Sequence, residues 1–214
     1  MGRCSLAVIL PVLSVMGAQP VALPTVVLST HTGGLGDPAR LDGSTYGAQA
    51  LEHYRALGVE FDCIYTGYLG GEAQVALAEK AFALWPAAKK VVDPVMGDNG
   101  KMYAALTDDY PERMRKFIEG ADIITPNITE ACLLTGRSFN PCPTLHETKE
   151  MLRELCGFGV RFAVITGFSE KGQLGAVGCF DGAFTECLTP KKDVACSGTG
   201  DVFASALLGA VLRG

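Results

Sequence analysis

The sequence predicts an α/β protein with a doubly wound, mostly parallel sheet that is flanked by helices on both faces. Short apolar runs of strand length alternate with amphipathic segments of helical length, which is the pattern of βαβ crossovers. Hydrophobic residues make up 48% of the chain and charged residues 19%, which is typical of a protein that buries a core. The length of 214 residues fits one domain, and we expect residues 1–214 to form it.

The individual strands and helices follow from two periodicities. Apolar runs bounded by turn residues predict strands over 21–29, 62–66, 90–95, 122–125 and 160–166. Apolar residues three and four positions apart predict helices over 44–57, 71–84, 107–119, 146–156 and 201–213, and the apolar stretch that begins at residue 2 is also helical. Residues 173–188 flank an Asp181-Gly182 turn, which predicts a hairpin that adds an antiparallel edge pair to the sheet.

Charge and cysteine usage narrow the class of protein. Lys and Arg number 18 and Asp and Glu 23, which gives a net charge of −5. The charges form no run of one sign, so we expect no nucleic acid as partner. The eight cysteines contain no CxxC pair, which disfavours a zinc knuckle or a redox motif and fits free thiols in a reducing cytoplasm.

The apolar stretch near the N-terminus raises the question of targeting. Arg3 followed by Leu6–Leu13 resembles a secretory signal peptide. Pro11, Pro20 and Pro24 fall inside the longer apolar stretch, and they suit a helix, a turn and a strand better than a signal peptide or a membrane-spanning helix. We therefore expect a cytoplasmic protein that is not bound to a membrane.

The segment Ser197–Asp201 comes directly before an amphipathic helix. Gly198 and Gly200 let the backbone turn so that its N–H groups converge, and the helix adds its positive dipole end. We expect Gly198, Thr199 and Gly200 to form an anion cradle, with Asp201 at its mouth as a carboxylate that can accept a proton from a hydroxyl. A plain glycine turn with Asp201 as helix cap fits the spacing equally well.

Acids follow two of the predicted strands. Asp93 and Asp98 come after a buried strand, at the edge where open α/β sheets meet nucleotide phosphates and Mg²⁺. Asn127 and Glu130 follow the next strand, and Glu130 can point toward the same crevice. Ordinary turns explain the first pair, and an Asn127 or Thr129 cap with a dipole-complementing Glu130 explains the second.

Small hydroxyl and glycine residues follow two further strands. Thr166-Gly167 and Ser29–Gly34 place such residues where a ligand site is expected. His31 is a candidate general base, but a single histidine in a turn is more often a hydrogen-bonding residue. We do not expect it to be catalytic.

Together, five segments resemble the ribokinase superfamily, and within it the pyridoxal/pyridoxamine/pyridoxine kinases. They are GRCSLAVILPVLSVMG at 2–17, LSTHTGG at 28–34, DPVMGDNGKMY at 93–103, TPNITEA at 125–131 and GTGD at 198–201. The resemblance covers essentially the whole chain and implies a ribokinase-like fold. It also implies transfer of a phosphoryl group from ATP to the 5′-hydroxymethyl group of a vitamin B6 vitamer, with Mg²⁺ and often K⁺, by a homodimer.

The resemblance also implies a role for each candidate residue. Asp201 becomes the base that contacts the vitamer, and Gly198, Thr199 and Gly200 hold the transferring phosphoryl oxygens. The ATP side is lined by Asp93, Thr125, Asn127, Glu130, Thr166 and Gly167. Asp98 and Glu130 are the expected metal ligands, and Thr32, Gly33 and Tyr68 border the pyridine ring.

The chain departs from the family pattern at both ends. Such kinases begin with a strand that ends in a serine or S-G-x-G turn, and they continue past the GTGD helix with further helices; we expect both to be missing here. A hydroxymethylpyrimidine kinase of the same superfamily shares the DPVM and TPN segments, but the continuation GDNGKMY at 97–103 favours the vitamin B6 kinases. The missing ends also leave open a non-catalytic remnant that binds a vitamer or a nucleotide.

Overall fold

The computed structural model describes residues 4–31, 35–194 and 196–214. Thr32 and Gly33 lie outside these residues. The chain divides into two compact units. The first comprises Met1–Glu60, Glu72–Leu84 and Val194–Gly214, and the second comprises Phe61–Gly71 and Trp85–Asp193. The expectation that residues 1–214 form one domain stays a prediction.

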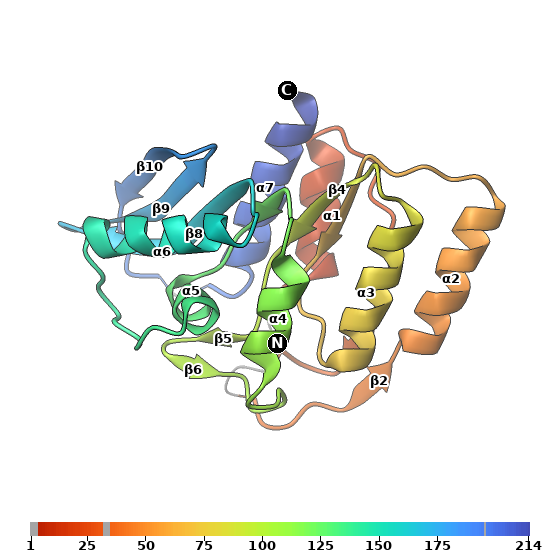
Figure 1. Ribbon diagram of the computed structural model, residues 1–214. Helices are drawn as coiled ribbons and strands as arrows, with labels where there is room; N and C mark the ends of the chain where they lie inside the picture. The colour runs from red at the N-terminus through yellow and green to blue at the C-terminus, as the bar shows by residue number, and fades with distance from the viewer. Residues whose placement is uncertain (1–3, 32–34, 195) are drawn as a thin grey trace. The chain divides into compact units, whose positions relative to one another are not determined.

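The second unit contains a six-stranded sheet with the order β10-β9-β8-β7-β4-β3 (Figure 1). Its strands are β3 (Cys63–Thr66), β4 (Lys89–Val92), β7 (Ile123–Ile124), β8 (Phe162–Glu170), β9 (Gln173–Phe180) and β10 (Ala183–Pro190). β3, β4, β7 and β8 run parallel, whereas β8, β9 and β10 form an antiparallel meander at one edge. The predicted edge hairpin is confirmed, and its turn uses positive φ at Asp181 (47°) and Gly182 (81°).

Three helices of the same unit pack on one another and on the sheet. They are α4 (Tyr110–Ile118), α5 (Ile128–Thr135) and α6 (Leu145–Gly157). α5 and α6 both contact β8, and α6 also contacts β9. Val92, Ile124 and Ile165 from the strands and Leu152 and Leu155 from α6 are fully buried. The α/β class with a mostly parallel, helix-flanked sheet is therefore confirmed.

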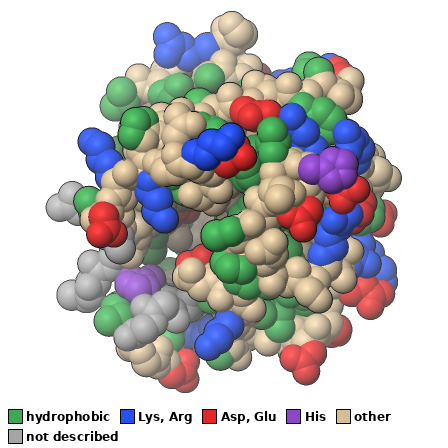
Figure 2. All heavy atoms as spheres, turned by 90° about the vertical axis from the view of Figure 1, so that its left-hand side faces the viewer, with side chains coloured by type: hydrophobic (Ala, Val, Ile, Leu, Met, Phe, Trp, Pro, Cys, Tyr) green, Lys and Arg blue, Asp and Glu red, His purple; other side chains and the backbone are tan. Residues whose placement is uncertain are grey.

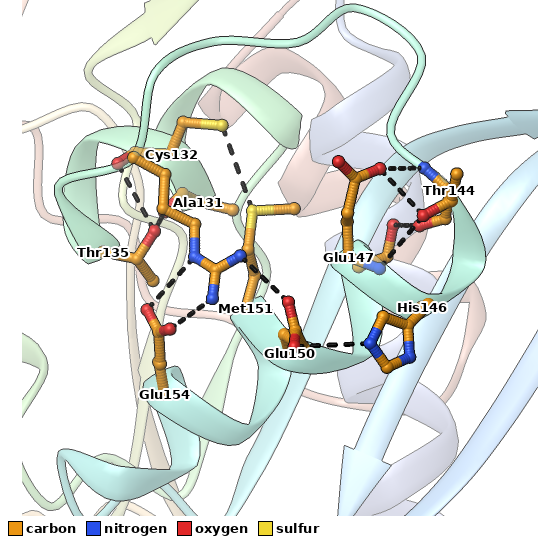
Figure 3. Close-up of polar contacts among 11 residues, drawn as sticks. Ala131, Cys132, Thr135, Thr144, His146, Glu147, Glu150, Met151 and Glu154 are labelled. Carbon is orange, nitrogen blue, oxygen red and sulfur yellow. Dashed lines mark hydrogen bonds and ion pairs between the residues drawn. The ribbon is translucent and has the colours of Figure 1, made fainter.

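Polar contacts fix α6 against the end of α5 (Figure 3). Thr144 caps α6, because its side chain accepts from the Glu147 N–H while the Glu147 carboxylate accepts from Thr144 N–H at 2.7 Å. Arg137, which follows α5, pairs with Glu150 at 3.4 Å and with Glu154. The paired side chains are partly exposed to water, which screens their attraction, so the buried leucines of α6 dominate its attachment.

The first unit consists mainly of helices that pack in pairs. α1 (Leu6–Val15) packs on α7 (Thr199–Arg213), and α2 (Ser44–Ala56) packs on α3 (Glu72–Leu84). The Gln74 side chain donates to Asp42 Oδ2 (2.8 Å) and Ser44 Oγ (2.9 Å). These bonds tie α3 to the start of α2.

The prediction of a sheet strand over 21–29 is wrong in extent and in partner. Only β1 (Val26–Leu28) is a strand, and it pairs antiparallel with β2 (Arg40–Asp42), outside the six-stranded sheet. Pro20 and Pro24 lack the N–H that a strand ladder needs, which confines the strand to the residues after them.

One face of the molecule shows how the charged side chains are distributed. On the face drawn in Figure 2, Lys and Arg side chains are interspersed with acidic and hydrophobic ones. Across the described residues, no helix combines the length and the apolar character that a membrane crossing requires.

A glycine lets α7 approach the end of α1, and this contact yields a stability prediction. A Cβ atom at Gly209 would lie 2.6 Å from Met16 Sδ and 2.8 Å from Met16 Cβ. Gly209→Ala should therefore destabilise the protein by about 1–3 kcal/mol through overpacking, measured by denaturant unfolding. Gly157→Ala, in a helix position with open space, is the control and should stabilise by about 0.5 kcal/mol. Equal stabilisation by both variants would contradict the packing argument.

Candidate active site

A pair of buried carboxyl groups lies at the carboxyl edge of the parallel strands. Asp93 directly follows β4 and is 7% exposed, and its N–H donates to the Thr66 carbonyl at 2.8 Å. Glu130, in the first turn of α5, is 3% exposed. The charge of Asp93 is near enough to raise the pKa of Glu130. The structure thus brings together two of the acids that the sequence predicts for this crevice.

The Glu130 carboxylate binds the backbone of two separate segments. Its Oε1 accepts from Met96 N–H at 3.1 Å, and its Oε2 accepts from Asn127 N–H at 2.8 Å. Burial, and then the charge of Asp93, raise the pKa of Glu130 well above its ordinary value, while main-chain N–H groups act in the opposite direction. This carboxyl group is therefore set to take up a proton or to be neutralised by a cation.

Asn127 performs the capping role that the sequence left open. Its Oδ1 accepts from the Glu130 N–H at 2.9 Å, which completes a capping box with the Glu130 carboxylate. Its Nδ2 donates to the Gly97 carbonyl at 2.9 Å. Both polar atoms of the amide are thus engaged within the protein, and contact of Asn127 with ATP stays a prediction.

Two buried threonine hydroxyls flank Asp93. Thr66 ends β3 on one side of β4, and Thr125 follows β7 on the other side, with side chains 8% and 5% exposed. Among the described residues, neither Oγ1 atom has a hydrogen-bond partner. A buried hydroxyl without a partner costs about 1–3 kcal/mol, so it points to a ligand or ion at this edge. The sequence prediction contains Thr125 but misses Thr66.

Thr166 and Gly167 lie one strand further along the same edge. Thr166 N–H donates to the Pro126 carbonyl at 2.9 Å, and Thr166 forms a parallel bridge with Asn127. Gly167 adopts φ 80° where the β8–β9 register shifts, and no neighbouring atom lies within 4 Å of a Cβ placed there. The backbone is therefore open at the point where the sequence predicts contact with the nucleotide.

Asp98 lies on a small hairpin that the strand predictions miss. β5 (Gly97–Asp98) and β6 (Lys101–Met102) are joined by Asn99 and Gly100, both at positive φ. Gly100 N–H donates to Thr129 Oγ1 at 3.0 Å, which anchors the tip of the hairpin to α5.

The Asp98 carboxylate is used within its own turn. It is exposed and accepts from Asn99 N–H (2.8 Å) and Asn99 Nδ2 (3.0 Å). The described residues gather no three His, Cys, Asp or Glu side chains as a metal site. Asp98, Asp93 and Glu130 thus form no ready-made three-carboxylate centre, and the role of Asp98 as a metal ligand stays a prediction.

In the first unit, the predicted anion cradle occupies the start of α7. Gly198 is the N-cap residue, with φ 82° and ψ 11°, and Thr199 and Gly200 begin the helix. A left-handed residue at this position favours glycine. Among the residues that the structure describes, no side chain caps α7, so its first N–H groups are not used by a cap of the kind seen in α5.

Asp201 bonds to another helix rather than capping its own. Its Oδ2 accepts from the Ser5 N–H at 2.8 Å, at the beginning of α1. Burial raises the pKa of Asp201, and the Ser5 N–H opposes this. The carboxyl group is therefore held in place, and its affinity for a proton is above that of an ordinary aspartate.

Of the residues expected to border the substrate, the structure describes Tyr68. Its ring meets Tyr103 edge-on, with centroids 6.4 Å apart and planes at 73°. Both tyrosines belong to the second unit. The other two expected residues, Thr32 and Gly33, lie outside the described residues.

Sequence comparisons assign a family to this chain. The profile of the family described as phosphomethylpyrimidine kinase matches residues 10–214. Pyridoxal kinase from Bos taurus is 32% identical over 92% of this chain and 69% of its own length. A Schizosaccharomyces pombe protein named as a pyridoxal kinase is 33% identical over 66% of this chain and 47% of its own length. The chain thus spans about half to two thirds of these two relatives.

Three solved structures share the fold over 100% of this chain. A Bacteroides thetaiotaomicron protein described as a phosphomethylpyrimidine kinase and crystallised with pyridoxal has a TM-score of 0.92, 35% identity and 77% of its own length covered. Pyridoxal kinase from Lactobacillus plantarum has a TM-score of 0.90, 36% identity and 77% coverage. The Leishmania donovani pyridoxal kinase in complex with ADP and pyridoxamine has a TM-score of 0.81, 25% identity and 76% coverage. The chain belongs to the phosphomethylpyrimidine kinase family, and several of the relatives that it matches are named pyridoxal kinases.

Proposed function

We propose that this protein is an ATP-dependent kinase that phosphorylates the 5′-hydroxymethyl group of pyridoxal, pyridoxamine or pyridoxine. The observation that carries the proposal is the start of α7, where an uncapped helix N-terminus is followed by the oriented carboxylate of Asp201. An anion site next to a proton acceptor is what phosphoryl transfer to an alcohol requires. The pyridoxal kinases among the relatives, and the complex of one with ADP and pyridoxamine, support the substrates.

In the proposed mechanism, Asp201 accepts the proton of the vitamer hydroxyl. Its Oδ2 is bonded to Ser5, so Oδ1 is the oxygen that takes the proton. Burial favours this step because it raises the proton affinity of the carboxylate. The main-chain N–H groups of Gly198, Thr199 and Gly200 donate to the transferring phosphoryl oxygens and stabilise their growing charge.

The residues at the edge of the sheet fit a cation. Asp93 and Glu130 are buried acids whose negative charges repel each other. The Thr125 hydroxyl is buried without a partner among the described residues. Oxygen donors of this kind suit Mg²⁺ or K⁺, and Mg²⁺ completes its shell with water and phosphate. We propose that these residues would hold the cation, which when bound would supply positive charge to the ATP phosphates. Thr166, Gly167 and Asn127 are proposed to line the nucleotide, and Asp98 is proposed as a further ligand of the metal.

The other parts of the proposal concern the vitamer, the assembly and the location. Tyr68, Thr32 and Gly33 are proposed to border the pyridine ring. The homodimer and the cytoplasmic location stay predictions.

The substrate is tested by assaying two hydroxymethyl heteroaromatics side by side with ATP and Mg²⁺. We expect pyridoxal 5′-phosphate to form, and the rate with hydroxymethylpyrimidine to be lower by about tenfold or more, because one mispaired polar group at a binding site costs at least this factor. Turnover of the pyrimidine alone would show a hydroxymethylpyrimidine kinase. Binding of pyridoxal and ATP without turnover would show a non-catalytic protein.

The base is tested by Asp201→Asn, which keeps the shape of the side chain and removes its basicity. We expect kcat to fall by about 10²-fold or more, while the Kd for ATP, measured by calorimetry, changes little. Asp181→Asn, in the hairpin turn of the sheet edge, is the control and should keep wild-type turnover. Unchanged turnover in Asp201→Asn would refute the assignment.

The cation site is tested by Thr125→Val, which replaces the hydroxyl, unpartnered among the described residues, with a methyl group of similar size. We expect stability to be unchanged or higher, and the Mg²⁺ or K⁺ concentration for half-maximal rate to rise about tenfold, since a lost bond to a charged partner costs about 1.5–3 kcal/mol.

Thr148→Val is the matched control for the cation test. Thr148 is fully buried, and its hydroxyl donates to the Thr144 carbonyl at 3.0 Å. This variant should lose stability and keep the wild-type cation dependence. A wild-type cation dependence in Thr125→Val, together with a changed one in Thr148→Val, would show that Thr125 is not part of the site.

A further inference from the structure

We propose that Ser5 is a positioning residue for the base, because its main-chain N–H fixes one oxygen of the Asp201 carboxylate and leaves the other for the substrate. The inference rests on the proposed function of Asp201. It concerns a contact between residues 196 positions apart in the chain. The Ser5 side chain has no part in it, so the contact leaves no motif in the sequence.

The backbone of Ser5 is held in an unusual conformation at the start of α1. Its φ of 54° and ψ of −139° lie in a region that favours glycine. Its carbonyl accepts the first helical bonds, from Val8 N–H (2.8 Å) and Ile9 N–H (3.0 Å). The helix therefore fixes the carbonyl side of Ser5, and the strained backbone turns the N–H toward Asp201.

The pairing of α1 with α7 makes this geometry rigid. The two helices pack along their lengths (Figure 1), with Ser5 against Asp201 at the first ends and Met16 against Gly209 near the last ends. Two contacts at opposite ends of a helix pair prevent sliding of one helix along the other. The position of the Ser5 N–H relative to the carboxylate is therefore set by helix packing rather than by a mobile side chain.

The contact also affects the protonation of the base. Burial raises the pKa of Asp201, and the hydrogen bond from the Ser5 N–H partly offsets this rise. Asp201 and Arg213 are the ionisable side chains of α1 and α7, and Arg213 lies at the far end of α7. Cys4 lies just before α1. The bond from Ser5 thus keeps the partly buried carboxylate ionised at a lower pH than burial alone would allow.

The test replaces the amide N–H of residue 5 with an ester oxygen, by incorporating glyceric acid, the hydroxy acid that corresponds to serine. The side chain is retained and only the donor is lost. We expect kcat to fall about tenfold, the KM for ATP to stay unchanged, and the acidic limb of the kcat profile to move to higher pH. The direction follows because loss of the donor raises the pKa of Asp201.

The same ester at Ser14 is the control, because the Ser14 N–H belongs to the interior of α1. That variant should lose stability and keep the wild-type pH profile. A wild-type kcat and pH profile for the ester at residue 5 would overturn the role of Ser5, while leaving the kinase activity intact.

A second measurement separates this proposal from the proposed function. Titration of the Asp201 side-chain carboxyl by carbon NMR needs no turnover. A higher pKa of Asp201 in the residue 5 ester than in the unmodified chain supports the contact, even if the unmodified chain proves inactive as a kinase. Identical titration curves would show that the Ser5 N–H does not act on the carboxylate.

Discussion

The buried carboxylate of Glu130 is the constraint on which the second unit depends. It joins Met96, directly before β5, to Asn127, at the start of α5, through two main-chain N–H groups. The end of β4, the beginning of α5 and the attached β5–β6 hairpin are thereby fixed to one another. The cost is a second negative charge beside Asp93 in a buried place, which the raised pKa of Glu130 reflects. The cation that we propose at this edge would relieve the cost, and the interaction that joins these elements would then also prepare the site.

Two helix N-termini in this protein have different uses. The N-terminus of α5 is closed by the reciprocal bonds of Asn127 and Glu130, and it serves structure. The N-terminus of α7 has a left-handed Gly198 in place of a side-chain cap, which leaves main-chain donors for an anion. The acidic residues in the first turns of the two helices differ in the same way. Glu130 bonds to the N-cap residue of its own helix, whereas Asp201 bonds to Ser5 at the start of another helix. Free main-chain N–H groups at a helix N-terminus and a carboxylate in a fixed position are two features that a phosphoryl transfer site needs.

The extent to which sequence predicts this structure depends on how local the signal is. Apolar periodicity identifies the strands and helices around the sheet, and Asp-Gly at 181–182 identifies the edge hairpin, because each signal lies within one element. The approach of Asp93 to Glu130 is also predictable, since the carboxyl ends of parallel strands share an edge. The contact between Ser5 and Asp201 is not, because it uses a main-chain donor that every residue type except proline carries. The Thr66 hydroxyl, which has no partner among the described residues, is missed because its burial depends on the whole fold. The strand predicted over 21–29 is wrong in extent and partner because strand pairing also depends on the whole fold.

The central claim is that the edge formed by Asp93, Thr125 and Glu130 holds the cation that accompanies the nucleotide. The most direct measurement uses Mn²⁺ in place of Mg²⁺, with a non-hydrolysable ATP analogue, and follows the relaxation of threonine methyl groups by NMR. The account predicts that the Thr125 methyl signal broadens far more than that of Thr148, which lies on α6 and bonds to Thr144. Equal broadening of the two signals, or none at Thr125, would contradict it.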